Sequence, residues 1–208
     1  MRHFDEDEPD VRPDLAGIRA TGWYLSSRTI VTAEHVTKAM KLSTMDWKPI
    51  EILDGDRSQF VAARVQRLAD GPLEKLALIE LQSAVSGARS VEIRKEPLLP
   101  DEKVITYASS GGRPRLVEGR FVRFGDEGKI AGTALLEVYE GENRFVIDHG
   151  ASGAPVMDCS GRVVAVVSDI FVQTIAWAAH NIRIPTAWGM PNVVSLPVRP
   201  LVESSRTD

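Results

Sequence analysis

Two short segments, far apart in the sequence, contain a serine and a histidine in settings that suit nucleophilic catalysis. Residues 150–155 read GASGAP and place glycines on both sides of Ser152. Such a sequence favours a sharp turn whose backbone N–H groups converge on one point, as the stabilisation of a tetrahedral oxyanion requires. Residues 32–36 read TAEHV and place His35 at the exit of an expected strand. A serine hydroxyl is a weak nucleophile, and a neutral imidazole within hydrogen-bonding reach activates it.

Each segment taken alone also has a purely structural interpretation. Glycine and serine are common turn residues, so the pattern G-x-S-G-x-P fits a hairpin loop without chemistry. A lone histidine fits the rim of a barrel, with its hydrogen bonds satisfied and no catalytic role. The catalytic interpretation therefore depends on the two segments occurring together.

The elements that must position these residues are expected to be β-strands. Stretches rich in Val, Ile, Thr and aromatic residues alternate with breaks that contain Gly, Pro, Ser or Asp, as in an all-β protein. Helical periodicity is limited to a turn or two after His35 and to residues 173–179. The expected strands are residues 20–25, 29–33, 60–67, 76–81, 103–108, 117–124, 134–139, 144–147, 154–157 and 162–168.

A break near residues 95–101, where two prolines interrupt the strand pattern, divides the chain into nearly equal halves. Strands of this spacing are typical of barrels or sandwiches. The predicted domains are an acidic N-terminal tail (1–14), an N-terminal β-barrel that carries the histidine (15–98), a C-terminal β-barrel that carries the serine (99–198) and a C-terminal tail (199–208).

Composition narrows the class of protein. A chain of 208 residues that is 43% hydrophobic and 26% charged can bury a core. Its net charge of -4 disfavours a nucleic acid partner. Its apolar runs are too short for a membrane span, and its acidic start does not resemble a secretory signal. The single cysteine, Cys159, excludes an intrachain disulfide, and four scattered histidines form no zinc signature. We therefore expect a cytoplasmic protein without a metal or cofactor.

In chain order, several segments resemble those of trypsin-like (chymotrypsin-fold) serine proteases, particularly small bacterial members and the HtrA-type protease domain. TAEHV resembles the family's T-A-A-H-V, KLALIEL at 75–81 resembles D-L-A-L-L-x-L, and GASGAPV at 150–156 resembles G-x-S-G-G-P-V. Residues 158–168 resemble the hairpin after the nucleophile, and residues 182–185 the late F-A-I-P strand. The resemblance covers residues 22–185 and implies two perpendicular six-stranded antiparallel β-barrels with the active cleft between them.

The resemblance also implies roles for individual residues. Ser152 Oγ would attack the scissile carbonyl, His35 would act as general base and then general acid, and the N–H groups of Gly150 and Ser152 would form the oxyanion hole. An apolar pocket base would favour small or medium apolar side chains before the scissile bond. The residues implied for this pocket are Val146 at its base, Ser168, Asp169 and Ile170 along its wall, and His149 at its rim.

The third position of the triad departs from the family pattern. In register, Lys75 occupies the place of the aspartate that orients the histidine; lysine has no acceptor and opposes the charge of an imidazolium. Two nearby carboxylates, Glu74 and Asp70, are candidates to replace this aspartate. In a regular strand Glu74 would point to the face opposite Lys75, so it needs a bulge or a shifted register to reach His35.

The sequence predicts a serine endopeptidase that acts on protein or peptide substrates through Ser152 and His35. One alternative is a catalytically impaired pseudoprotease that uses the same cleft to bind peptides. Another is an esterase-like acyl hydrolase with the same two residues. The positions of Glu74, Asp70 and the Lys75 ammonium relative to the imidazole distinguish the first two.

Overall fold

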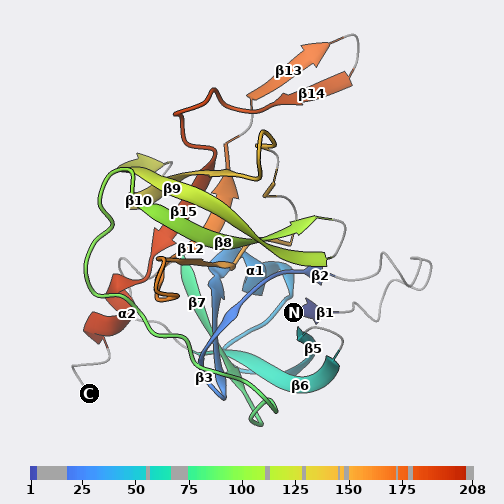
Figure 1. Cartoon of the computed structure of the whole chain (residues 1–208). Coiled ribbons are helices and arrows are strands. Elements are labelled where there is room, and N and C mark those ends of the chain that lie inside the picture. Colours follow the sequence, from blue (N-terminus) through green and yellow to red (C-terminus); the bar gives the residue numbers. More distant parts are fainter. Residues whose placement is uncertain are drawn as a thin grey trace.

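The computed structural model describes residues 1–3, 18–54, 57–66, 75–110, 113–127, 130–144, 146–147, 150–171, 173–177 and 180–204. Within these ranges almost all regular structure is β-strand, as the sequence predicts. Figure 1 shows a group of N-terminal strands below a group of C-terminal strands, with the short helix α1 (Glu34–Ala39) between them.

The N-terminal half forms an antiparallel sheet with the strand order β2-β1-β5-β6-β7-β4-β3 among the described residues. The strands predicted at residues 29–33 and 76–81 are confirmed. The prediction of a closed six-stranded barrel is wrong for this half, because the sheet is open. Its strands are β1 (Arg2–His3), β2 (Ile18–Arg19), β3 (Trp23–Ser26), β4 (Thr29–Ala33), β5 (Lys48–Asp54), β6 (Arg57–Gln66) and β7 (Leu76–Leu81).

The segment between the two edge strands of the open sheet does not pair these strands with each other within the described residues. Edge strands β2 and β3 are consecutive in the chain, so residues 20–22 join the two edges covalently. Ala20 exchanges hydrogen bonds with Met1, at 3.0 Å and 2.8 Å. The N–H of Thr21 donates to the carbonyl oxygen of Ser152 in the other half, at 3.0 Å. The bonds of Ala20 therefore extend the pairing of β1 with β2, whereas the N–H of Thr21 attaches this segment to the C-terminal half.

The C-terminal half forms a closed antiparallel barrel, as predicted, in the order β10-β15-β12-β11-β8-β9. Strand β11 pairs with both β12 and β8, which closes the ring. A separate hairpin of β13 (Gln173–Trp177) and β14 (His180–Ile184) projects away from this barrel (Figure 1). The barrel strands are β8 (Lys103–Ser110), β9 (Arg113–Glu127), β10 (Ile130–Tyr139), β11 (Pro155–Met157), β12 (Val163–Ile170) and β15 (Val193–Pro197).

Several local predictions differ from the structure. The helical turn expected at residues 173–179 is wrong for its described part, since β13 pairs along its whole length with β14. The strand expected at residues 144–147 is not formed by its described residues. Both segments predicted as tails contain regular structure: Arg2 and His3 pair with β2, and residues 199–204 form helix α2 (Arg199–Ser204). Leu201 in this helix is buried, which explains why the polar end of the chain is ordered there.

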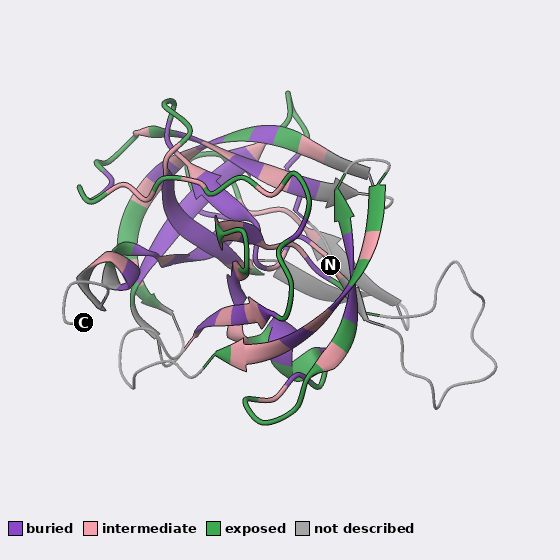
Figure 2. Ribbon diagram, turned by 90° about the horizontal axis from the view of Figure 1, so that it is seen from below, coloured by how far each residue is buried: buried purple, intermediate pink, exposed green. Residues whose placement is uncertain are grey.

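Strand β12 lies between the two hydrophobic cores. Val163 and Val166 belong to the core of the first sheet, whereas Val164, Ala165 and Val167 belong to the core of the barrel. An uninterrupted apolar run fits a strand that is buried on both faces. Figure 2 shows the buried residues concentrated in the central strands and the exposed ones in the outer loops. Strand β12 also contacts β4, so it connects the two halves at the strand that leads to His35.

Helices in the described residues are short. Both α1 and α2 span six residues. No helix in this part of the chain therefore has the length and apolarity that crossing a bilayer would require.

Candidate active site

The loop around Ser152 depends on two glycines with left-handed backbone conformations. Gly150 has φ of 95° and Gly153 has φ of 89°, a region that residues with a side chain rarely adopt. A Cβ atom at position 153 would also overlap the carbonyl oxygen of Thr21 and the Oγ1 of Thr32. Glycine at this position therefore permits both the turn and the close approach of the N-terminal sheet.

Three hydrogen bonds link this loop, through Thr21, to the strand that leads to the histidine. Thr21 donates through Oγ1 to the carbonyl oxygen of Gly150 at 2.6 Å, and through its N–H to that of Ser152 at 3.0 Å. Thr32 Oγ1 donates to the carbonyl oxygen of Thr21 at 2.8 Å. Because Thr32 precedes His35 by only three residues, Thr21 links the strand before the histidine to the turn that carries the serine.

The backbone amides of the loop fall into two groups. The N–H of Gly153 donates to the carbonyl oxygen of Val167 at 2.8 Å, and that of Ala154 donates to Ala151 at 2.9 Å. By contrast, the N–H groups of Gly150 and Ser152 donate to no backbone carbonyl of the described residues. These two amides are the ones that the sequence predicts for an oxyanion hole.

The hydroxyl of the half-buried Ser152 has a backbone acceptor nearby. Its Oγ donates to the carbonyl oxygen of Ser168 at 3.5 Å, a long and therefore weak hydrogen bond. Among hydrogen bonds between described residues, none joins this hydroxyl to the imidazole of His35. Catalytic hydrogen bonds are often long or misaligned before a substrate binds, so this geometry does not argue against the pairing.

His35 is the second residue of α1, directly after the buried strand β4. The start of the helix is fixed by the Glu34 N–H, which donates to the carbonyl oxygen of Lys75 at 2.8 Å. His35 is exposed by its surface area, and partial desolvation by neighbouring groups lowers the pKa of its imidazole below the usual 6.5, although the carboxylates of Asp169 and Glu34 act in the opposite direction. The imidazole is therefore mainly neutral at pH 7, which is the form that accepts a proton.

The predicted third members of the triad, Glu74 and Asp70, lie outside the described residues, as does His149. Lys75 is described, and it lies in a turn before β7 rather than within the strand. Val146 is fully buried in the core of the barrel. The remaining predicted pocket residues, Ser168, Asp169 and Ile170, end strand β12 beside the Ser152 loop.

Sequence reasoning did not identify Thr21, the residue that joins the two halves at this site. It lies in a sequence, GIRATGW, whose glycine spacing carries no signal for a contact with residues near position 150. The effect of Asp169 on His35 was also not predicted, because it depends on how β12 approaches β4. Both contacts are long-range in the sequence, which explains why no local pattern reveals them.

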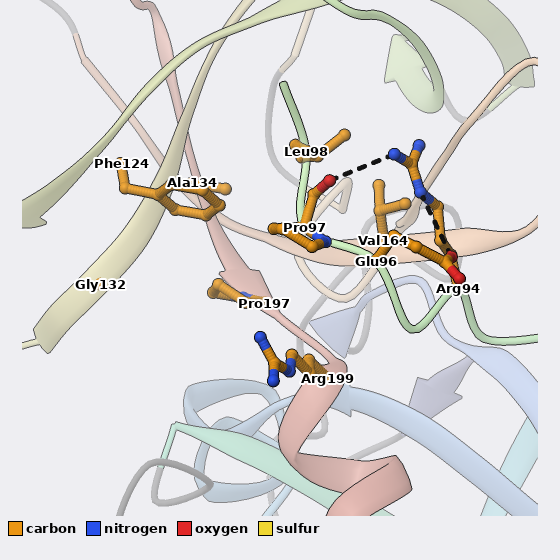
Figure 3. A pocket seen from close by; sticks show the side chains of 10 residues that line it. All are labelled: Arg94, Glu96, Pro97, Leu98, Phe124, Gly132, Ala134, Val164, Pro197 and Arg199. Atoms are coloured by element: carbon orange, nitrogen blue, oxygen red, sulfur yellow. Dashed lines mark hydrogen bonds and ion pairs between the residues drawn. The ribbon is translucent and has the colours of Figure 1, made fainter. Parts of the chain in front are cut away.

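A separate cavity of about 360 Å³ lies elsewhere on the barrel, and no residue predicted for catalysis lines it. Figure 3 shows Arg94 beside it, bonded to the carbonyl oxygen of Pro97 and to Glu96. Arg94 also pairs with Glu102, so its charge is already compensated. The cavity is lined by Arg94, Glu96, Pro97, Leu98, Phe124, Gly132, Ala134, Val164, Pro197 and Arg199. Within the described chain no group of three or more His, Cys, Asp or Glu side chains could hold a metal ion.

Comparison with known proteins identifies the fold and one domain family. The family model of the trypsin-like peptidase domain matches residues 20–166. No sequence among curated proteins matches the chain.

Solved structures of proteases have the same fold. The HtrA-type protease AlgW with a decapeptide has a TM-score of 0.61 and 14% identity, over 100% of this chain and 61% of that chain. An inactive form of Rv3671c from M. tuberculosis has a TM-score of 0.57 and 14% identity, over 90% and 80%. The apo protease domain of MamO from Magnetospirillum magneticum has a TM-score of 0.55 and 14% identity, over 89% and 87%. At such identities the likeness concerns the fold.

Proposed function

Because this chain belongs to the trypsin-like peptidase family, we propose that it is a serine endopeptidase with Ser152 as nucleophile and His35 as general base. The observation that carries this proposal is the chain of hydrogen bonds through Thr21. It connects the Ser152 loop with the strand that leads to His35, although more than a hundred residues separate them in the sequence. The division into a histidine-bearing half (15–98) and a serine-bearing half (99–198) is part of the same proposal.

In the proposed reaction, Ser152 Oγ attacks the carbonyl carbon of the scissile peptide bond while His35 takes the hydroxyl proton. The N–H groups of Gly150 and Ser152 stabilise the oxyanion of the tetrahedral intermediate. His35 then gives its proton to the leaving amine, and water hydrolyses the acyl-enzyme by the same route. The lowered pKa of His35 supports this assignment, since a base must be unprotonated before it can act.

The proposed substrates are proteins or peptides, in keeping with the decapeptide carried by the structurally similar AlgW. Ser168, Asp169 and Ile170 would border the substrate beside Ser152, with His149 at the rim. Val146 would close the pocket from below, since it is fully buried. A pocket with an apolar floor favours small or medium apolar side chains before the scissile bond. A cytoplasmic location remains a prediction from the sequence.

A second candidate function is a peptide-binding pseudoprotease. One observation favours it: Lys75 stands at the position expected for the triad aspartate. In this case the cleft would hold a peptide without cleaving it. An esterase-like acyl hydrolase would use the same serine and histidine on a different acyl group.

Labelling with a fluorophosphonate probe tests the endopeptidase proposal directly. We expect the native chain to be labelled and Ser152→Ala to be unlabelled, while Ser160→Ala, which removes an exposed serine in the turn after β11, is labelled like the native chain. The labelling rate should rise with pH through an apparent pKa below 6.5, because deprotonation of His35 activates the serine. Mass spectrometry of the labelled peptide identifies the modified residue.

The two alternatives give different results. A chain that binds peptides but shows no labelling dependent on Ser152 between pH 6 and 9 would be a pseudoprotease. A chain that is labelled and cleaves activated esters, but releases no new termini from unfolded protein substrates, would be an acyl hydrolase.

A further inference from the structure

Among the described residues, charged groups near His35 lie on α1, in the turn before β7 and on β12. On α1, Glu34 forms an ion pair with Lys38 at 2.5 Å. Lys75, before β7, contributes the carbonyl oxygen that holds the start of this helix. Asp169 lies near the end of β12, and its carboxylate raises the pKa of the imidazole more than that of Glu34 does.

Asp169 follows an irregularity in the pairing of β12 with β15. Val167 pairs with Ser195, but Asp169 pairs with Val194, so the register shifts at Ser168. Such bulges redirect side chains and are frequent beside active sites. Here the shift lies at the residue whose carbonyl oxygen accepts the Ser152 hydroxyl. Asp169 is therefore the residue next to the nucleophile's hydrogen-bond acceptor.

The carboxylate of Asp169 is exposed but held in place. Its Oδ1 accepts a hydrogen bond from the N–H of Ile170 at 2.8 Å. Among the described residues, no lysine or arginine forms an ion pair with it, whereas the charge of Glu34 is compensated by Lys38. Of the two carboxylates near the imidazole, only Asp169 keeps a negative charge that no ion pair within the described chain compensates.

We propose that Asp169 stabilises the imidazolium of His35 during catalysis. It would provide the negative charge that the triad aspartate provides in other members of the family. This inference rests on the proposed function of Ser152 and His35. Asp169 acts through the histidine and so is a positioning residue rather than a catalytic one. The substitution of lysine at position 75 is tolerated because the compensating charge comes from the C-terminal half instead of the N-terminal half.

The first test measures the pKa of the His35 imidazole by NMR in the Ser152→Ala protein, so that no activity is needed. Adding Asp169→Asn should lower this pKa, because the negative charge that favours the protonated ring is removed. Asp169→Glu should retain most of the effect. Asp126→Asn is the matched control: Asp126 is also an exposed strand carboxylate that accepts a backbone N–H, from Gly132 at 2.9 Å, and its removal should leave the pKa unchanged.

The second test uses the protein with an intact Ser152. Asp169→Asn should lower kcat on a peptide substrate by roughly 10-fold, the size expected for a partly solvated charge near the ring, and Asp169→Glu should restore most of it. The acid limb of the kcat/KM profile should move to lower pH in the Asn variant. A protein in which Asp169 merely supports the fold would lose activity without that movement.

An unchanged pKa of His35 in the Asp169→Asn protein overturns the proposal. A larger fall of this pKa in Asp70→Asn or Glu74→Gln than in Asp169→Asn also overturns it, because the role would then belong to one of those residues. If Asp169→Asn lowers the pKa but the native chain is never labelled at Ser152, the electrostatic pairing stands and the proposed enzymatic function fails. The two hypotheses are therefore tested separately.

Discussion

At Gly153, Thr21 and Thr32 of the N-terminal half approach the Ser152 loop closely. We expect Gly153→Ala to destabilise the protein by roughly 3 kcal/mol or more. The added Cβ would strain a backbone that is in the left-handed conformation, and it would overlap backbone and side-chain oxygen atoms. Urea unfolding measures this loss. Fluorophosphonate labelling of Ser152 should fall as well, because the loop must move to relieve the overlap.

Gly161→Ala is the matched control for this change. Gly161 has φ of 79°, but a Cβ atom at this position would have no atom within 4 Å. The variant should therefore lose about 1 kcal/mol of stability, the cost of a side chain on a left-handed backbone without any overlap. Equal losses in the two variants would mean that the contact between Gly153 and the threonines does not contribute to stability.

At the scale of elements, the short segment between β2 and β3 determines how the Ser152 loop is held. Thr21→Val removes the hydrogen bond from Oγ1 to the carbonyl oxygen of Gly150 while keeping the shape of the side chain. We expect a loss of about 1 kcal/mol in the free energy of unfolding, and a fall in the labelling rate of roughly 10-fold because the amides proposed for the oxyanion hole lose their fixed position.

Thr133→Val gives the control, since Thr133 Oγ1 makes an equivalent bond to the carbonyl oxygen of Gly125 at 2.7 Å, within the β9–β10 pair. This variant should be destabilised to a similar extent yet be labelled at the native rate. A Thr21→Val protein that is labelled at the native rate would show that the attachment stabilises the fold without positioning the site.

For the molecule as a whole, one buried ionic network joins the barrel to the loops on its side. Glu137 on β10 accepts hydrogen bonds from Arg144 at 2.5 Å, from Arg120 on β9 at 2.8 Å and from the N–H of Gly189 at 2.9 Å. Burial by itself would raise the pKa of Glu137, but these hydrogen bonds and the arginine charges hold it below its usual value. The network attaches Arg144, which follows β10, and Gly189, which precedes β15, to the barrel.

We expect Glu137→Gln to cost roughly 3 kcal/mol, because Arg144 stays buried without its counter-charge. Since the pKa of Glu137 is lowered on folding, its contribution is present above the unfolded-state pKa of about 4.5 and is lost as the pH falls through the lower folded-state value. Stability curves between pH 3 and 7 should therefore be flatter in the variant.

Glu140→Gln is the matched comparison, since the Arg115–Glu140 pair joins β9 to the residue directly after β10 and is much more solvent-exposed than the Arg144–Glu137 pair. It should cost less than about 1 kcal/mol. Similar losses in Glu137→Gln and Glu140→Gln would show that burial of the first pair adds nothing to its contribution.

The sequence was sufficient to predict the features that depend on neighbouring residues. The buried strands at 29–33 and 76–81, the helical turn at His35 and the glycine turn around Ser152 follow from local apolar patterns and from backbone preferences. The order of motifs was also sufficient to predict the family. Strands β5, β13 and β15 were missed, because their short apolar runs compete with helical and irregular alternatives of similar local propensity. The strand that the family resemblance implied at residues 182–185 overlaps β14.

Contacts between distant residues could be known only from the folded chain. Thr21 bonds to the Ser152 loop across 129 residues, and the open state of the N-terminal sheet is visible only in the pairing of its strands. Asp169 reaches the surroundings of His35 only because β12 shifts its register and packs against β4. Local propensity encodes strands and turns, whereas the pairing of remote groups is decided by the packing of two cores around one shared strand.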